Sequence, residues 1–271
     1  MQKGAIIGKG MTAEVYEWGQ DKVLKLYFDW YPEDWVKYEA QIGSLVHTAG
    51  VSSPAVYEMQ EVDGRKGIIF QRITGRTLFE LIESKPWKLV YFAREMARLH
   101  AKMHSCIADK LPSQKERIIS AVKESSDLFG DNEKTIIDYL DSLPDGKSIC
   151  HGDFHPDNII ANGKELVIID WTNAYIGNPF GDVARTCLMI RSPFLPPEAF
   201  KLMVTLSRVI KRLIYSAYLK EYTKLTKSTF KSIDEWILPI AAARFREKIP
   251  GEEKWLINII NKHLEHLGRS I

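Results

Sequence analysis

A short segment near the middle of the chain holds side chains that could carry out phosphoryl transfer. Residues 151–158 read HGDFHPDN, and a later apolar stretch ends at Asp170. Such a transfer needs a carboxylate that accepts the proton of the attacking hydroxyl, and oxygen ligands that hold magnesium against the nucleotide phosphates. Asp153, Asn158 and Asp170 supply this set, and Asn158 follows Asp153 by five positions, the interval of a kinase catalytic loop. Aspartate and asparagine also suit ordinary turns, but a turn does not explain the loop and the downstream aspartate together.

A second group of residues, near the N-terminus, matches part of a loop that covers nucleotide phosphates. Gly8, Gly10 and Val15 stand at the first two glycines and the valine of that loop, with Lys9 between the glycines. Glycine lets backbone N–H groups approach phosphate closely, and Ala13 stands where protein kinases have the third glycine. We expect Gly8, Lys9, Gly10 and Val15 to bind the nucleotide, against the alternative of a hairpin that merely contains two glycines.

Lys25 lies inside an apolar run, VLKL at residues 23–26. A lysine within an apolar strand is the arrangement expected of the residue that pairs with nucleotide phosphates in kinases. A lysine on the solvent face of a strand is the simpler alternative. The order of the motifs favours the first reading, because the glycine loop, the strand lysine and the catalytic loop follow one another as they do in kinases.

At these residues the sequence resembles the aminoglycoside phosphotransferase and choline kinase superfamily, whose catalytic loop typically reads HGDxHxxN with a downstream IDW or IDF. The resemblance implies that Asp153 is the catalytic base and that Asn158 and Asp170 bind Mg²⁺. It also implies that His151 braces the loop without reacting. His155 stands where many protein kinases place a lysine near the transferred phosphate, and the sequence leaves open whether it contacts phosphate or only packs.

The same resemblance assigns supporting roles to residues further along the chain. Glu39, on the helix that follows Lys25, would form the ion pair that steadies this lysine. Glu33 is the competing acid, but it lies in the first turn of that helix, where the helix dipole explains a carboxylate. The linker whose backbone binds adenine would consist of Gln71, Arg72 and Ile73.

Three further residues have two readings each. Asp182 resembles a family aspartate that supports the catalytic loop, although an acid at a helix N-terminus is an equally good explanation. His100 and His104 share a helix face at i, i+4 spacing, but the glutamate of the HExxH zinc motif is missing and no third ligand is evident. We therefore expect no zinc site.

The elements that position these residues change in character along the chain. Residues 5–72 read as short strands separated by turns, among them Asp63-Gly64, and one helix is predicted from Pro32 to Gly50. After Gly75, long amphipathic segments predict helices at 78–84, 87–106, 114–128 and 133–143 and from Pro197 onward. A hairpin is predicted around Asn162-Gly163.

These elements predict an α+β protein of the protein-kinase-like bilobal fold. The small N-terminal lobe, residues 1–73, would combine an antiparallel sheet with one helix and bind the nucleotide. The larger and mainly helical lobe, residues 74–271, would carry the catalytic loop and the acceptor site.

Composition limits the classes of partner. The formal net charge of +2 lacks the strong positive field of a nucleic-acid binder. No stretch approaches the roughly 20 uncharged apolar residues that cross a bilayer, and the N-terminus lacks a signal-peptide core. The cysteines, Cys106, Cys150 and Cys187, have no CxxC spacing, which fits reduced thiols. We expect a cytoplasmic monomer or homodimer without nucleic acid or membrane partners.

The expected reaction is transfer of the γ-phosphate of ATP, with GTP as the alternative, to a hydroxyl of a small molecule. A peptide acceptor is disfavoured, because the segment formed by residues 170–182 is short and no Ala-Pro-Glu motif follows it. Beyond residue 200, where the acceptor pocket is expected, basic residues outnumber acidic ones by roughly two to one. The acceptor stays open between an aminoglycoside-type antibiotic and a metabolite such as choline, a sugar or an amino alcohol. An inactive nucleotide-binding regulator and an unusual protein kinase are the competing readings.

Overall fold

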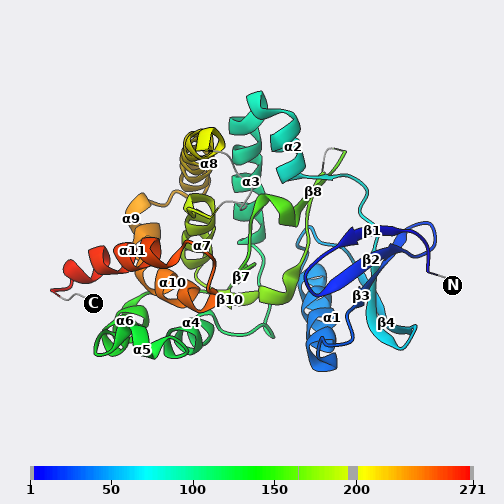
Figure 1. Cartoon of the computed structure of the whole chain (residues 1–271), viewed down its shortest axis with the longest axis horizontal. Coiled ribbons are helices and arrows are strands. Elements are labelled where there is room, and N and C mark those ends of the chain that lie inside the picture. The colour runs from blue at the N-terminus through cyan, green and yellow to red at the C-terminus, as the bar shows by residue number, and fades with distance from the viewer. Residues whose placement is uncertain (1–2, 164, 195–200, 269–271) are drawn as a thin grey trace. The chain divides into compact units, whose positions relative to one another are not determined.

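The computed structural model describes residues 3–163, 165–194 and 201–268, and the chain divides into two compact units (Figure 1). The first unit contains residues 1–81 together with 156–174. The second contains residues 82–155 and 175–271.

The first unit is built on a five-stranded antiparallel sheet with the strand order β1-β2-β3-β5-β4. The strands are β1 Ile6–Lys9, β2 Ala13–Glu17, β3 Lys22–Tyr27, β4 Val56–Val62 and β5 Arg65–Gln71. Asp63 and Gly64 join β4 to β5, and both have positive φ, at 53° and 76°. Two successive positive φ angles are the signature of the type I′ turn that suits the twist of a hairpin, so the turn predicted from Asp-Gly is confirmed.

Helix α1, Glu33–Thr48, packs against this sheet. Its buried residues include Val36, Ile42 and Val46, which recur at helical spacing and form one apolar face. A Cβ atom on Gly43 would lie 2.8 Å from Val56 Cγ2 on β4, so glycine at this position lets the helix approach the sheet closely. The helix therefore has a fixed position over the sheet, and with it the buried Glu39.

A second, three-stranded sheet completes the first unit. Its order is β6-β8-β9, with β6 Arg76–Thr77, β8 Ile159–Asn162 and β9 Glu165–Ile168. The short 3-10 helices η2, Pro156–Asn158, and η3, Trp171–Asn173, flank the β8-β9 hairpin. The N–H of Ile168 donates to the carbonyl of Ser52 at 2.8 Å, and Ser52 Oγ donates to the carbonyl of Leu166 at the same distance. These bonds hold the hairpin to the segment that follows α1.

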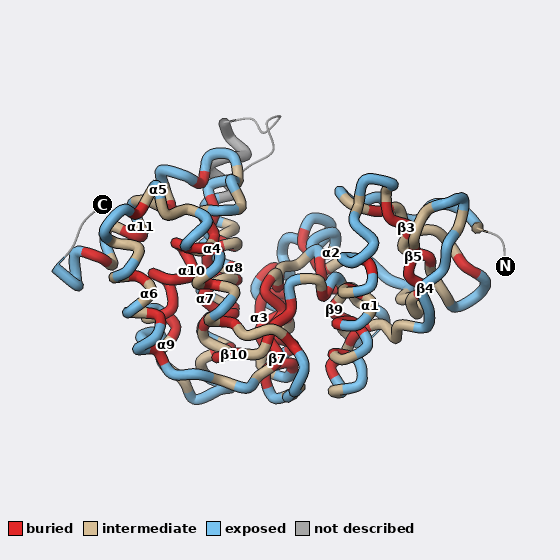
Figure 2. Tube along the Cα trace, turned by 90° about the horizontal axis from the view of Figure 1, so that it is seen from below, coloured by how far each residue is buried: buried red, intermediate tan, exposed pale blue. Residues whose placement is uncertain are grey.

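The second unit is mainly helical. Helix α10 is its most buried helix, and α4, α6, α7 and α11 pack around it, while α3 packs along α8 (Figure 2). Beyond α2, Leu78–Ser84, which runs from the first unit into the second, the elements are η1 Pro86–Lys88, α3 Leu89–Met103, α4 Gln114–Lys123, α5 Ser126–Phe129, α6 Asn132–Ser142, β7 Ser148–Cys150, β10 Tyr175–Gly177, α7 Pro179–Arg191, α8 Lys201–Thr226, α9 Phe230–Asp234, α10 Ile237–Arg244, η4 Phe245–Glu247 and α11 Glu253–Glu265.

The predicted class is confirmed: an antiparallel sheet with a helix is followed by a mainly helical region. Two predicted helices differ in detail. The segment 114–128 is interrupted after Lys123, and the segment 87–106 starts as a 3-10 turn at Pro86. Pro197, where the next helix was expected to begin, lies outside the described residues.

The three cysteines are all free, and Cys150 and Cys187 are buried. The buried positions of Cys150 and Cys187 suit packing residues. Within the described part of the chain, no helix is both long enough and apolar enough to span a bilayer.

Candidate active site

Lys25 on β3 lies between two carboxylates of the first unit. Its Nζ is 2.6 Å from Oε1 of Glu39 on α1 and 3.4 Å from Oδ1 of Asp170. Burial of Lys25 opposes its charge, but Glu39 and Asp170 outweigh this cost and raise the pKa of the lysine above its ordinary value. The ion pair predicted between Lys25 and Glu39 is present, whereas the competing Glu33 pairs with Lys37 at 3.0 Å.

Asp170 follows β9 in an unusual backbone conformation. Its φ of 63° and ψ of 69° are left-handed, a region that aspartate tolerates better than most residues. The next turn is held from both sides: Trp171 Nε1 donates to the carbonyl of Ile168 at 3.0 Å, and Thr172 Oγ1 donates to Glu39 Oε2 at the same distance. The side chain of Asp170 stays half-exposed, so its carboxylate is accessible to a ligand.

Asn158 lies next to this segment because of the β8-β9 hairpin. It precedes β8 and Asp170 follows β9, and the antiparallel register pairs Ile159 with Ile168. The carbonyl of Asn158 accepts a hydrogen bond of 2.9 Å from the N–H of Ile169. The two expected metal ligands therefore sit at the same end of one hairpin, and both offer side-chain oxygen atoms, the kind that Mg²⁺ prefers.

The glycine-containing loop is the turn between β1 and β2. Gly8 pairs with Val15, and the N–H of Gly10 donates to the carbonyl of Ala13 at 2.9 Å. A Cβ atom on Gly8 would lie 3.6 Å from Val15, and one on Gly10 would lie 3.7 Å from the Ala13 carbonyl, both ordinary contacts. Packing does not require glycine at either position. Lys9, between them, is largely exposed.

The predicted adenine linker is tied to its surroundings at its first two residues. The N–H of Gln71 donates to the carbonyl of Ala55 at 2.8 Å, and the N–H of Arg72 donates to the carbonyl of Asp21 at 2.9 Å. The guanidinium of Arg72 also pairs with Glu17 at 2.8 Å. Ile73 follows directly after these two anchored positions.

The second unit holds Asp153, in the loop that follows β7. Its Oδ2 lies 3.5 Å from Nε2 of His155, and its Oδ1 lies 3.9 Å from the guanidinium of Arg185. Burial alone would raise the pKa of Asp153, but His155 and Arg185 outweigh this effect and lower it to about 2. Asp153 is therefore a carboxylate at neutral pH, and its side chain is about one third exposed, at 31%.

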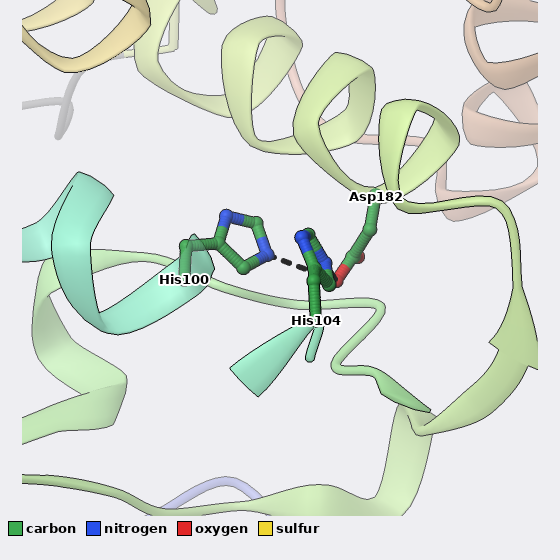
Figure 3. Close-up of side chains that lie close together, drawn as sticks. All are labelled: His100, His104 and Asp182. Carbon is green, nitrogen blue, oxygen red and sulfur yellow. Dashed lines mark hydrogen bonds and ion pairs between the residues drawn. The ribbon is translucent and has the colours of Figure 1, made fainter. Parts of the chain in front are cut away.

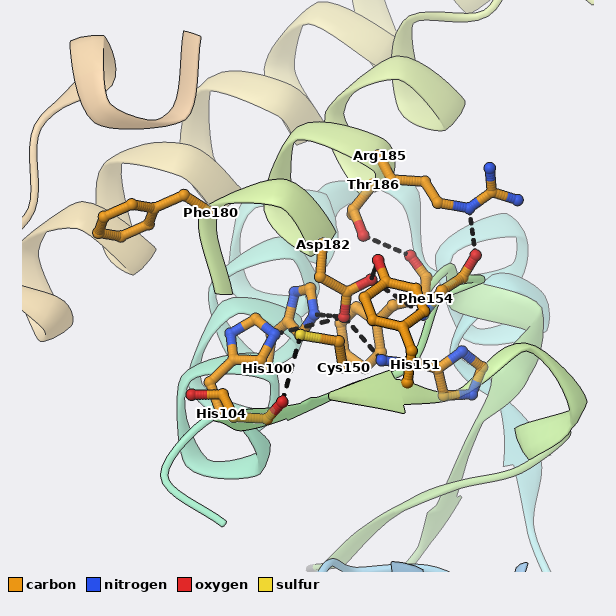
Figure 4. Close-up of polar contacts among 12 residues, drawn as sticks. His100, His104, Cys150, His151, Phe154, Phe180, Asp182, Arg185 and Thr186 are labelled. Atoms are coloured by element: carbon orange, nitrogen blue, oxygen red, sulfur yellow. Dashed lines mark hydrogen bonds and ion pairs between the residues drawn. The ribbon is translucent and has the colours of Figure 1, made fainter. Parts of the chain in front are cut away.

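Asp182, near the start of α7, supports the loop from its buried side. Oδ2 accepts the N–H of His151 at 2.7 Å, and Oδ1 accepts the N–H of Gly152 at 2.9 Å and the hydroxyl of Tyr175 at 3.2 Å (Figure 4). His151 is fully buried, and its Nδ1 accepts the N–H of Asp153 at 3.1 Å. The contacts expected of Asp182 and His151 as supports of the loop are thus present.

Arg185 and Thr186, one turn further along α7, hold the rest of the loop. Arg185 Nε donates to the carbonyl of Gly152, and Thr186 Oγ1 donates to the carbonyl of Phe154 at 3.0 Å (Figure 4). Arg185 is itself held by Glu247, at 2.6 Å. Neither residue was predicted from the sequence, although positions i+3 and i+4 from Asp182 share its helix face and could have indicated them.

His100 and His104 point towards Asp182 (Figure 3). Their Nε2 atoms lie 3.0 and 3.3 Å from its Oδ2, and the three side chains place possible metal-ligating atoms within 4.8 Å of one another. The third possible ligand that was not evident from the sequence is therefore Asp182, and the expectation of no zinc site stays a prediction. Sequence spacing could not reveal it, because Asp182 comes from a different helix.

The sequence matches the family described as Phosphotransferase enzyme family over residues 3–201. The chain belongs to this family. The resemblance and the kinase-like fold expected from the catalytic-loop motif are therefore confirmed, and the chain is a member of a group of phosphotransferases. None of the curated proteins matches the chain.

Solved structures of related enzymes share the fold at low sequence identity. A thermostable mutant of aminoglycoside phosphotransferase APH(4)-Ia, in its apo form, has a TM-score of 0.65 and 14% identity, covering 97% of this chain and 95% of that one. The streptomycin–ATP–APH(2")-IIa ternary complex has a TM-score of 0.56 and 14% identity, covering 97% and 91%. Choline kinase from Cryptosporidium parvum Iowa II has a TM-score of 0.56 and 15% identity, covering 98% and 89%.

Proposed function

We propose that this protein transfers the γ-phosphoryl group of ATP to a hydroxyl of a small molecule. The observation that carries the proposal is the position of Lys25, whose ammonium lies between Glu39 and the half-exposed Asp170. An ammonium group fixed in this way suits pairing with a nucleotide phosphate. The accessible carboxylate beside it suits binding of the metal ion that accompanies the phosphate. Membership of the phosphotransferase family supports the same chemistry.

The nucleotide would be bound by residues of the first unit. Packing would tolerate a side chain at Gly8 and at Gly10, yet neither residue has one. The backbone there is uncovered, which suits close approach of phosphate oxygens. Lys25 would pair with those oxygens. Ile73 is the linker position that we assign to adenine, since the N–H groups of Gln71 and Arg72 already donate within the protein.

Asn158 and Asp170 would hold Mg²⁺, because their side-chain oxygens lie at one end of the β8-β9 hairpin. The bound cation would neutralise charge on the nucleotide phosphates during transfer.

Asp153 would accept a hydrogen bond from the acceptor hydroxyl and orient it towards the phosphorus atom. With a pKa of about 2, its carboxylate is too weak a base to remove the proton early. Such a base suits the loose transition state of phosphoryl transfer, in which the attacking oxygen needs orientation more than prior ionisation. Contacts from His155 and Arg185 keep Asp153 ionised for this task.

The acceptor class that we favour is an aminoglycoside-type small molecule. The solved complexes of similar fold include a ternary complex with streptomycin and a complex with gentamicin. The short segment between Asp170 and Asp182 offers little platform for a peptide. The choline kinase neighbour makes an amino alcohol the second candidate.

The test is a nucleotide-consumption screen with ATP, GTP and Mg²⁺ across aminoglycosides, macrolides, choline-like amines and sugars. Phosphorylated product, identified by mass spectrometry, should form with at least one small alcohol and should disappear in Asp153→Asn. Asp157→Asn changes an exposed carboxylate of the same loop and should keep turnover. Near-normal turnover in Asp153→Asn would remove Asp153 as the base, and phosphate found only on protein would overturn the acceptor class.

A further inference from the structure

A buried polar network joins three helices of the second unit. Tyr218 and Tyr222 of α8 lie opposite His100 of α3 and His104 at the C-cap of α3, and both histidines contact Asp182 of α7. His104 is 7% exposed and the other four side chains are fully buried. The two histidines and the two tyrosines are each spaced i, i+4, so two parallel chains of the form tyrosine, histidine, aspartate converge on one carboxylate.

The charge on Asp182 follows from its partners. Its two oxygens accept from the N–H groups of His151 and Gly152, from the hydroxyl of Tyr175 and from both histidines. The two backbone N–H groups can only donate, and an ionised carboxylate accepts from both of them. Burial would favour the neutral form, but the hydrogen bonds from the histidines outweigh it and keep the pKa well below the ordinary range.

The ionised carboxylate fixes where each histidine carries its proton. Because Asp182 can only accept, Nε2 of His100 and Nε2 of His104 must each bear a hydrogen. The Nδ1 of each neutral ring is then an acceptor. Tyr218 donates its hydroxyl to His100 Nδ1 at 2.6 Å, and Tyr222 donates to His104 Nδ1 at 2.7 Å.

His100 also contacts the catalytic loop directly. Its ring stacks on Phe154 with ring centroids 3.9 Å apart and an angle of 21° between the planes. Phe154 is fully buried and follows Asp153 in the chain. His100 therefore contacts the loop in two ways, through its hydrogen bond to Asp182 and through its ring contact with Phe154. His104 has the longer bond to Asp182.

We propose that the pairs Tyr218–His100 and Tyr222–His104 are positioning residues that hold Asp182, and through it the backbone before Asp153, in the catalytic arrangement. The inference rests on the proposed function, in which Asp153 carries the chemistry. A metal ion on His100, His104 and Asp182 is the competing assignment. A metal ion would need lone pairs of the histidine nitrogens and of the Asp182 oxygens, and these atoms already take part in hydrogen bonds. The contacts therefore favour a hydrogen-bonded network over a metal site.

The first test measures the two tautomers without reference to activity. Nitrogen-15 NMR of histidine-labelled protein at neutral pH should show two neutral rings with a proton on Nε2 and none on Nδ1. Tyr218→Phe should alter the His100 signals and leave those of His104 near their positions, and Tyr222→Phe should do the reverse. Imidazolium rings, protons on Nδ1, or stoichiometric zinc retained through purification would each overturn the assignment.

The second test separates positioning from mere stability by kinetics. His100→Ala should lower kcat roughly 10-fold to 100-fold, the scale expected when a catalytic group is slightly misplaced, with the KM for ATP nearly unchanged. His100→Gln keeps a donor for Asp182 and should recover most of kcat, and His104→Ala should cost less than His100→Ala. Leu219→Ala removes a buried side chain on α8 beside Tyr218 and should lower Tm without this loss of kcat.

Equal kcat losses in Leu219→Ala and His100→Ala at matched Tm would refute the positioning role. If Asp153→Asn kept its turnover, the proposed function would fail, while the tautomers would still be measurable. The two failures are therefore distinguishable.

Discussion

Acid should destabilise this protein through His100, and replacing that residue should remove much of the effect. Burial, followed by the nearby His104, lowers the pKa of His100 to about 3 in the folded protein, although the hydrogen bond to Asp182 opposes the change. In the unfolded chain the pKa returns to about 6.5. Between these two values the unfolded chain binds a proton that the folded protein does not bind, so stability falls as the pH falls from about 6.5 to about 3.

The magnitude follows from the separation of the two pKa values. Each pH unit in this window costs about 1.4 kcal/mol, so lowering the pH from 7 to 4.5 should cost about 3 kcal/mol through this one group. Since His100 is completely buried, solvent does not screen the effect. A loss of this size is a large share of the 5–15 kcal/mol typical of folded proteins.

The assay is urea unfolding of the wild type and of His100→Gln at about pH 7 and about pH 4.5. Glutamine keeps a donor and an acceptor but does not titrate. The drop in the free energy of unfolding between the two pH values should be about 2–3 kcal/mol smaller in the variant. The substitution itself changes stability at both pH values, and this constant change cancels when the two drops are compared. Identical drops in the two proteins would refute the conclusion that His100 is buried in its neutral form.

Other expectations concern the first unit. Glu39→Gln removes the carboxylate that holds Lys25 at 2.6 Å, and steady-state kinetics should show kcat/KM for ATP falling at least about 10-fold; an unchanged kcat/KM would contradict the role of the ion pair. Gly8→Ala adds a methyl group 3.6 Å from Val15 and should leave Tm within about 2 °C, yet nucleotide titration should show weaker ATP binding. Gly43→Ala is the matched contrast, because its methyl group would meet β4 at 2.8 Å: Tm should fall by several degrees, and equal Tm values for the two variants would refute this packing argument.

The sequence by itself determined the local elements and the candidate chemical groups. Short stretches separated by turn residues indicated the strands, and Asp63-Gly64 indicated a turn, which the structure forms with two positive φ angles. The spacing of Asp153, Asn158 and Asp170 indicated a kinase-like catalytic loop. Such signals are readable because they depend on residues close in sequence, whose geometry is set by backbone dihedrals and by the period of a helix or strand.

Tertiary structure alone decided which distant side chains meet. Glu33 and Glu39 lie on one helix, and only the packing of α1 against the sheet turned Glu39 towards Lys25. The hairpin at residues 156–174 groups with the first unit because β8 pairs with β6 and Ile168 bonds to Ser52, contacts between segments far apart in the chain. The boundary predicted at residue 73 stays a prediction.

The histidine pair illustrates the physical reason best. Spacing placed His100 and His104 on one helix face, but it could not tell a metal site from a hydrogen-bonded core. That depended on a carboxylate from α7 and two hydroxyls from α8, brought together in a buried space where each polar group must find a partner. Periodicity tells which side of an element is buried, and only the packing of the elements tells what each buried polar group will meet.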